Sequence, residues 1–180
     1  LHYYQTHREE THLGAEPLAT SRSNKQLLDN YGEQMIALLS TSVTPRIAQR
    51  CQDAGLQSYW FNPAYDDYDL PDSFTRKVYD LIPFPCVNVG GNVGTAAWIM
   101  AHSVFQIPKV ALVGFDFSYY PDTELEKTQY YEELVAVAGP DDLETLLPRL
   151  TNPNTGEEFF TDPAYYWYRQ VFLELATTAP

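Results

Sequence analysis

The sequence predicts an α/β protein in which a mainly parallel sheet carries helices on both faces, giving three layers. Short apolar runs that are typical of buried strands alternate along the chain with longer segments of helical spacing. One strand–helix–strand unit spans residues 35–61, and a second spans residues 86–117 and contains a Gly-rich turn. Because parallel strands need a crossover connection, this alternation indicates a parallel sheet.

The first unit combines apolar runs with clear helix signals. Gly32 ends a short helix, and the apolar centre of the next segment predicts a buried strand. Thr44 and Pro45 supply a capping residue and a proline at the first helical position, and Gly55 ends that helix. The elements predicted here are a helix over 24–31, a strand over 34–40, a helix over 45–54 and a strand over 57–61.

The second unit follows a loop rich in Asp, Tyr and Pro. Asp72 or Ser73 caps a helix that reaches Leu81, and Pro83 and Pro85 end it. We then expect a strand over 86–89, a helix over 93–105 and a strand over 110–113. The apolar stripe expected on the 93–105 helix consists of Val93, Ala96, Ala97, Met100, Ala101 and Val104.

The rest of the chain is predicted to be mainly helical. Helices are expected over 128–137, 141–147 and 163–176, the last one started by Asp162 and Pro163. We therefore assign residues 23–180 to one domain, with a C-terminal helical portion over about 128–176. Residues 1–22 are polar and are interpreted as an arm, or as the remnant of a truncated upstream region, because the chain starts at Leu1.

Composition narrows the classes of partner. The chain has 180 residues, a formal net charge of -13 and 44% hydrophobic residues. This acidity excludes a duplex nucleic acid partner, which needs a basic surface, but a local nest of N–H groups can still bind a small phosphorylated ligand. No apolar run approaches the ~18 residues of a membrane span, and no signal peptide is visible. With Cys51 and Cys86 expected as free thiols, we predict a cytoplasmic protein.

The Gly-rich turn before the 93–105 helix is the main candidate binding site. Gly91 permits a positive φ and close approach of a ligand, and Gly94 lets the helix lie close to the sheet. N–H groups at a helix start favour anions, usually phosphate. The spacing is neither the dinucleotide fingerprint nor a P-loop, and a purely structural turn is the alternative. The candidate binding residues here are Gly90, Gly91, Asn92, Val93, Gly94 and Thr95.

Asp116 is the candidate catalytic residue. It follows the predicted strand 110–113, so it would reach the crevice at the carboxyl end of the sheet. There it would orient a hydroxyl group, ligate a metal or act as a base; the alternative is a loop-capping aspartate. Tyr119 and Tyr120 follow it and would line the nucleotide pocket, where a base or sugar stacks. Equally, such rings would pack in the core and at a contact between copies of the chain.

Other charged groups offer weaker signals. The Asp66–Asp69 run contains an Asp-x-Asp pair that could hold a divalent metal, but a solvated, turn-forming loop is the favoured interpretation. No Cys/His cluster has metal-ligand spacing, so no protein metal site is predicted. Lys127 and Arg169 are candidate phosphate partners in an otherwise acidic chain.

The run Gly90–Ala97, the helix after it and the run Val110–Phe117 resemble the core of the MptE-like family. That family includes an archaeal 6-hydroxymethylpterin diphosphokinase and bacterial motility accessory factors, which are implicated in attaching nonulosonic acid sugars to flagellin. The same order of Gly-rich turn, helix and Gly-x-Asp is similar to bacterial sialyltransferases that use CMP-sugars. The resemblance covers about residues 35–116 in order of elements, and only 90–117 carries a motif.

The resemblance implies a Rossmann-like fold and a nucleotide-dependent transferase. It carries over Gly91, Asn92, Gly94, Thr95 and Asp116 as ligand-binding candidates. The catalytic histidine of the transferases has no match, since His102 lies inside the predicted helix.

Three functions remain open. A glycosyltransferase-like enzyme would use a nucleotide-activated sugar such as a CMP-sugar, and the scarcity of Lys and Arg near the turn favours it. A diphosphokinase would pass pyrophosphate from ATP to a pterin alcohol and would need Mg²⁺. A non-catalytic nucleotide-binding or assembly module is the third alternative.

Overall fold

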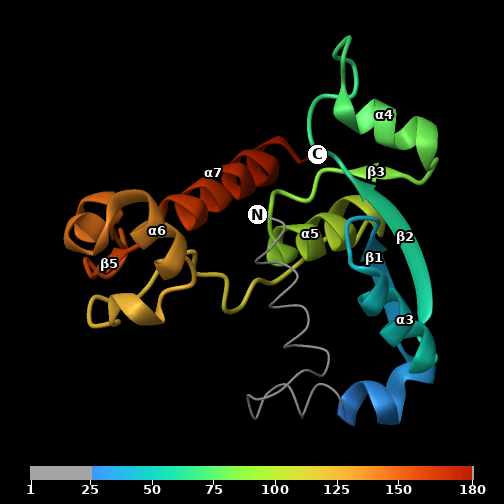
Figure 1. Cartoon of the computed structure of the whole chain (residues 1–180), viewed down its shortest axis with the longest axis horizontal. Coiled ribbons are helices and arrows are strands. Elements are labelled where there is room, and N and C mark those ends of the chain that lie inside the picture. The colour runs from blue at the N-terminus through green and yellow to red at the C-terminus, as the bar shows by residue number, and fades with distance from the viewer. Residues whose placement is uncertain (1–25, 180) are drawn as a thin grey trace. The chain divides into compact units, whose positions relative to one another are not determined.

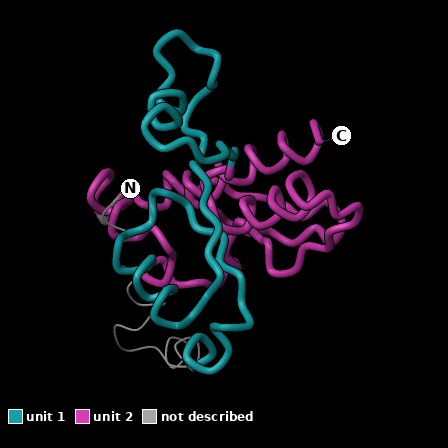
Figure 2. Tube along the Cα trace, turned by 90° about the vertical axis from the view of Figure 1, so that its right-hand side faces the viewer, with its two compact units in different colours: residues 1–88 teal, residues 89–180 magenta. Residues whose placement is uncertain are grey.

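The computed structural model describes residues 26–179 (Figure 1). They fall into two compact units, of which unit 1 ends at Asn88 and unit 2 begins at Val89 (Figure 2). The division lies inside the range 23–180 that the sequence assigns to one domain. The predicted arm over 1–22 lies outside the described residues, and the predicted first helix is helical over 26–31.

Unit 1 is built on a three-stranded parallel sheet in the order β1-β2-β3. A short 3₁₀ turn, Gly32–Gln34, precedes the sheet, whose strands are β1 (Ile36–Ser40), β2 (Gln57–Pro63) and β3 (Cys86–Val87). Helix α3 (Pro45–Asp53) connects β1 to β2, and α4 (Phe74–Leu81) connects β2 to β3. The predicted strand–helix–strand unit and the parallel sheet are therefore confirmed.

One face of this sheet packs against α3. Leu39 of β1 forms a buried cluster with Ile47 and Cys51 of α3, and Trp60 of β2 packs against that cluster. Strand residues alternate between the two faces. On the opposite face Ile36 is 64% exposed, and Leu38 and Tyr59 are exposed as well.

A buried asparagine ties the carboxyl end of β2 to its surroundings. Asn62 is fully buried. Its Oδ1 accepts a hydrogen bond from Thr41 Oγ1 at 2.8 Å, and its Nδ2 donates to the carbonyl oxygen of Ile82 at 2.7 Å. A buried amide without partners would be costly, so these bonds fix the loops after β1 and α4.

Unit 2 starts with α5 (Val93–Ile99), which continues as a π-helix, η2 (Met100–Val104). Its remaining elements are η3 (Leu125–Lys127), α6 (Tyr131–Ala138), η4 (Pro140–Leu146), the antiparallel strands β4 (Arg149–Thr151) and β5 (Glu158–Phe160), and α7 (Pro163–Thr178). Asp162 caps α7 as predicted. The predicted 141–147 helix is a 3₁₀ helix, and the β4–β5 hairpin was not predicted.

The predicted strand over 110–113 is wrong. The described part of the chain has no strand there, and Val113 is 93% exposed. An apolar run supplies β-propensity, but a strand also needs a neighbouring ladder. Gln106 at φ 55° and Gly114 at φ 67° turn the backbone on either side of this segment. The β3 strand is correspondingly short and ends at Val87 rather than at the predicted residue 89.

The predicted apolar stripe of α5 is confirmed only in part. Its member Met100 is buried, but Val93 is 85% exposed and Val104 is 49% exposed. Thr95, Trp98 and Ile99, which lie outside the predicted stripe, are buried. Trp98 packs edge-on against Phe172 of α7, with ring centroids 5.4 Å apart. The largest side chain therefore decides which face of the helix turns inward, and the small residues do not.

Candidate functional site

The Gly-rich turn at the start of unit 2 has the backbone conformation that the sequence predicts. Gly90 has φ 60° and Gly91 has φ 79°. Both angles lie in the left-handed region that side chains disfavour, so two consecutive glycines are required here.

Asn92 and Thr95 close the turn on itself. Asn92 Oδ1 accepts the backbone N–H of Thr95 at 2.9 Å, which caps α5. Asn92 Nδ2 donates to Thr95 Oγ1 at 2.8 Å and to the Gly90 carbonyl oxygen at 3.3 Å. Thr95 is fully buried. These two predicted ligand-binding side chains therefore hold the shape of the turn.

Val93 and Gly94 occupy the first two positions of α5. The first N–H groups of a helix have no acceptor within the helix. Among the hydrogen bonds of residues 26–179, none engages the N–H of either residue. The cap thus satisfies the third N–H of α5 and leaves the first two for another acceptor.

The glycines of the turn face aromatic rings of unit 2. A Cβ built on Gly91 would lie 2.6 Å from Trp167 Cζ3 and 2.8 Å from Tyr168 Cε1. A Cβ on Gly94 would lie 2.1 Å from Phe115 Cε2. The space predicted for a ligand at Gly91 and for the sheet at Gly94 is therefore filled by side chains of the chain itself. Trp167 remains 54% exposed beside the turn.

Asp116 lies on an exposed loop and not at the end of a strand. Its neighbours anchor it: Phe115 packs on Gly94 and on Phe172, and Phe117 packs on Phe115. The carbonyl oxygen of Phe117, which has φ 52°, accepts a hydrogen bond from the buried Thr161 Oγ1 at 2.7 Å. Asp116 thus directly follows Phe115, whose ring contacts Gly94, and the side chain of Asp116 is exposed to solvent.

Tyr119 and Tyr120 do not join the turn. Tyr119 donates a 2.8 Å hydrogen bond to the buried Asp162, and its backbone pairs with Phe160. Tyr120 is 70% exposed and its nearest ring is Phe159, with centroids 5.6 Å apart. Pairing with β5 and the bond to Asp162 account for the contacts of Tyr119, and a role of either tyrosine in a ligand pocket stays a prediction.

Asp162 is the group that sequence reasoning recognised only as a cap. It is fully buried, and its Oδ1 accepts the N–H of Tyr165 at 2.7 Å. Burial raises the pKa of its carboxyl, although hydrogen bonds from Tyr165 and Tyr119 oppose that rise. Burial likewise raises the pKa of Tyr119 and of Tyr130.

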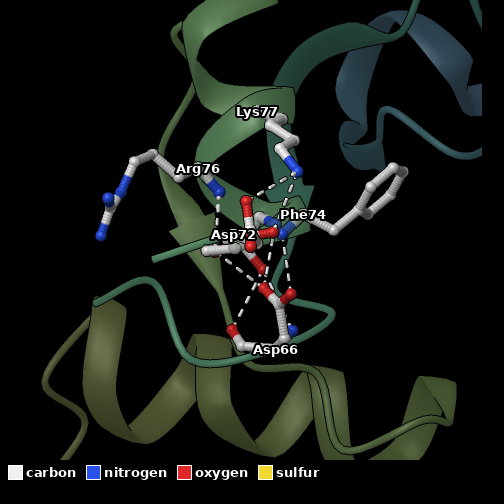
Figure 3. A network of polar contacts seen from close by, with 7 residues as sticks. Asp66, Asp72, Phe74, Arg76 and Lys77 are labelled. Carbon is white, nitrogen blue, oxygen red and sulfur yellow. Dashed lines mark hydrogen bonds and ion pairs between the residues drawn. The ribbon is translucent and has the colours of Figure 1, made fainter. Parts of the chain in front are cut away.

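The acidic loop of unit 1 folds around Asp66, on which the contacts in Figure 3 converge. Asp66 Oδ2 accepts the N–H of Phe74 at 2.7 Å, and Oδ1 accepts the N–H of Thr75 at 3.0 Å and Ser73 Oγ at 2.8 Å. These bonds hold the pKa of Asp66 well below its usual range. Asp67 Oδ1 accepts the N–H of Asp69 at 2.9 Å, as the turn-forming interpretation expects.

The other residues considered as phosphate, catalytic or metal-binding candidates have contacts of their own. Lys127 Nζ forms an ion pair with Glu124 at 2.9 Å, and both side chains are exposed. The ring of His102 stacks on Trp98, with centroids 5.1 Å apart. Within residues 26–179 no group of three His, Cys, Asp or Glu side chains is arranged to hold a metal, and no helix there is long and apolar enough to cross a membrane.

Comparisons with known proteins identify no relative of this chain. No model of a protein family matches the chain, and neither the curated proteins nor the solved structures contain a match.

Proposed function

We propose that this chain is a nucleotide-dependent transferase that holds a ligand phosphate at the start of α5. The observation that carries the proposal is the pair of N–H groups of Val93 and Gly94, which have no acceptor among the described residues. A phosphate oxygen is the acceptor that such a position favours.

Helix α4 provides an internal comparison for this site. Its first two N–H groups, on Phe74 and Thr75, are held by the carboxylate of Asp66, and Ser73 accepts the N–H of Arg76. At α5 Asn92 plays the part of Ser73, but no described side chain plays the part of Asp66. A phosphate would complete the same arrangement with two charge-assisted hydrogen bonds.

The ring of Trp167 supports a nucleotide as the phosphate carrier. It is partly exposed and its edge lies against Gly91, which precedes the first residue of α5 by two positions. Stacking on an aromatic side chain is worth about 1 to 3 kcal/mol per base. A ligand with both a phosphate and a base therefore gains from both features.

Asp116 is the residue we assign to the reacting end of the ligand. It follows Phe115, whose ring contacts Gly94, and its carboxylate is exposed. A carboxylate in this place can accept the proton of an attacking hydroxyl. Sugar transfer from a CMP-activated donor remains the favoured reaction; pyrophosphoryl transfer from ATP, with Mg²⁺, is the alternative. The proposal includes the three-layer Rossmann-like arrangement, which the parallel β1-β2-β3 sheet supports.

A thermal-shift screen against CMP, CDP, UDP, GDP, ATP and NAD, with and without Mg²⁺, tests the proposal. A ligand at 100 times its dissociation constant should stabilise the protein by about 2.7 kcal/mol. Asp116→Asn should keep that shift and lose turnover of the matching sugar nucleotide or ATP by orders of magnitude. The exposed Asp122→Asn is the matched control and should keep both. No shift with any nucleotide would contradict the proposal.

A non-catalytic binding module is the second candidate. Asn92 and Thr95 hydrogen-bond to each other within the turn, and Tyr119 hydrogen-bonds to Asp162. Asp116 therefore has no neighbouring acid–base side chain among its described contacts, which favours a module without catalytic activity. Nucleotide stabilisation of the wild-type protein that is accompanied by no turnover would favour the module over the transferase.

A further inference from the structure

Four hydrogen bonds form a closed ring in unit 2. Tyr119 Oη donates to Asp162 Oδ2 at 2.8 Å, and the N–H of Gln129 donates to Tyr119 Oη at 3.0 Å. Tyr165 Oη donates to Gln129 Oε1 at 2.5 Å, and the N–H of Tyr165 returns to Asp162 Oδ1 at 2.7 Å. The rings of Tyr119 and Tyr165 stack, with centroids 5.3 Å apart.

The ring joins three segments that lie far apart in the sequence. Tyr119 belongs to the loop after Asp116, Gln129 precedes α6, and Asp162 starts α7. The loop is also held by Thr161, which donates to the carbonyl oxygen of Phe117, and by the backbone pair between Tyr119 and Phe160. A change at Asp162 therefore acts on the loop that carries Asp116.

Both oxygens of Asp162 have a partner that can donate to an ionised carboxylate. A carboxylate only accepts, and both of its oxygens face a donor. A protonated Asp162 has a hydrogen of its own to place. Its Oδ2 faces the hydroxyl of Tyr119, so one of these two hydrogens must turn away. The bond donated by Tyr119 is then lost, or Asp162 donates to Tyr119 Oη in its place.

We propose that Asp162 forms a pH-dependent latch, which fixes Tyr119 against the start of α7 when the carboxylate is ionised and releases it on protonation. Complete burial of a charge favours the neutral form, and the raised pKa of Asp162 agrees with this. The titratable groups whose charge is coupled to Asp162 are Tyr119 and Tyr130, with Tyr165 coupled to both of these tyrosines. Protonation of Asp162 removes a buried negative charge at the cost of the hydrogen bond that Tyr119 donates.

The latch has a consequence for Asp116 that rests on the proposed function. Release of Tyr119 loosens the loop after Asp116, so turnover should fall as pH drops through the Asp162 midpoint. The latch itself does not need a ligand, so its test separates it from the nucleotide site.

Titration of side-chain carboxyl ¹³C signals, together with the ring signals of Tyr119, tests the latch in the full chain. We expect Asp162 to titrate above the usual aspartate value of about 3.9, with Tyr119 changing at the same midpoint. Asp162→Asn should abolish the change, whereas Asp122→Asn should leave it intact. An Asp162 midpoint at or below the usual value would overturn the proposal. So would ring signals of Tyr119 that do not change at the Asp162 midpoint.

Tyr119→Phe keeps the test decisive if Asp162→Asn does not fold. It removes one hydroxyl and retains the ring. Because the hydrogen bond from Tyr119 favours the ionised carboxyl, its loss should move the Asp162 midpoint upward. An unchanged or lower midpoint in Tyr119→Phe would show that Asp162 is only a structural cap.

Discussion

Helix α4 of unit 1 and helix α5 of unit 2 begin with the same kind of cap but differ in what surrounds it. Ser73 and Asn92 each accept the N–H three residues ahead. Asp66 then occupies the first two N–H groups of α4, whereas the described residues place nothing on those of α5. One helix start is completed by its own sequence, and we propose that the other is completed by a ligand phosphate.

The two capping aspartates differ in a second way. Asp66 is exposed and its hydrogen bonds lower its pKa, whereas Asp162 is buried and desolvation raises its pKa. Each accepts backbone N–H groups at a helix start. The solvent exposure of the carboxylate, which cannot be read from the sequence, therefore decides whether the same local arrangement favours or disfavours its ionised form.

The largest effect we expect is on the stability of the α5 turn. Gly91→Ala should lower the free energy of unfolding by about 2 to 4 kcal/mol, because it adds a clash with Trp167 and Tyr168 to the strain of φ 79°. Gly114→Ala is the matched control: its φ is 67°, but its Cβ would meet nothing within 4 Å. Urea unfolding should show the smaller loss there. Equal losses would mean that the aromatic rings do not pack on the turn.

A smaller effect is expected on the pH dependence of the free energy of unfolding, to which Asp66 and Asp162 contribute with opposite signs. The lowered pKa of Asp66 contributes stability above the ordinary aspartate pKa, and this is lost as pH falls through the folded value. The raised pKa of Asp162 has the opposite sign: stability is greatest at low pH and is lost as pH rises through the folded value. Unfolding of wild type, Asp66→Asn and Asp162→Asn from pH 2 to pH 7 measures both slopes. Slopes of the same sign would contradict the comparison.

The sequence predicts unit 1 well because its signals are local. The apolar run before Ser40, the Thr44-Pro45 helix start and the run ending at Phe61 each report on adjacent residues. The glycine conformations and the cap of α7 at Asp162 were predictable for the same reason.

Unit 2 was harder to predict because distant residues decide its structure. Tyr119 and Asp162 are 43 positions apart, and nothing in the spacing pairs them. The inward face of α5 follows from the contact of Trp98 with Phe172 rather than from apolar spacing. The segment 110–113 has the composition of a strand, but the described chain gives it no strand partner. The backbone conformation of the site's glycines could therefore be predicted, whereas the contacts of its tyrosines could not.

The central claim is that the first two N–H groups of α5 bind phosphate, and Val93→Pro tests it most directly. Proline is well tolerated at the first helical position, and Asn92 already has the extended backbone, φ −146° and ψ 160°, that a following proline needs. The side chain of Val93 is 85% exposed, so the change removes one N–H group and little else. Val93→Ala retains that N–H and is the control.

The measurement is calorimetric titration of wild type, Val93→Pro and Val93→Ala with CMP and with ATP. A hydrogen bond to a charged group is worth about 1.5 to 3 kcal/mol. We therefore predict that at least one nucleotide binds wild type and Val93→Ala alike and binds Val93→Pro roughly tenfold or more weakly. Equal affinity in the two variants, or no binding to wild type, would contradict the account.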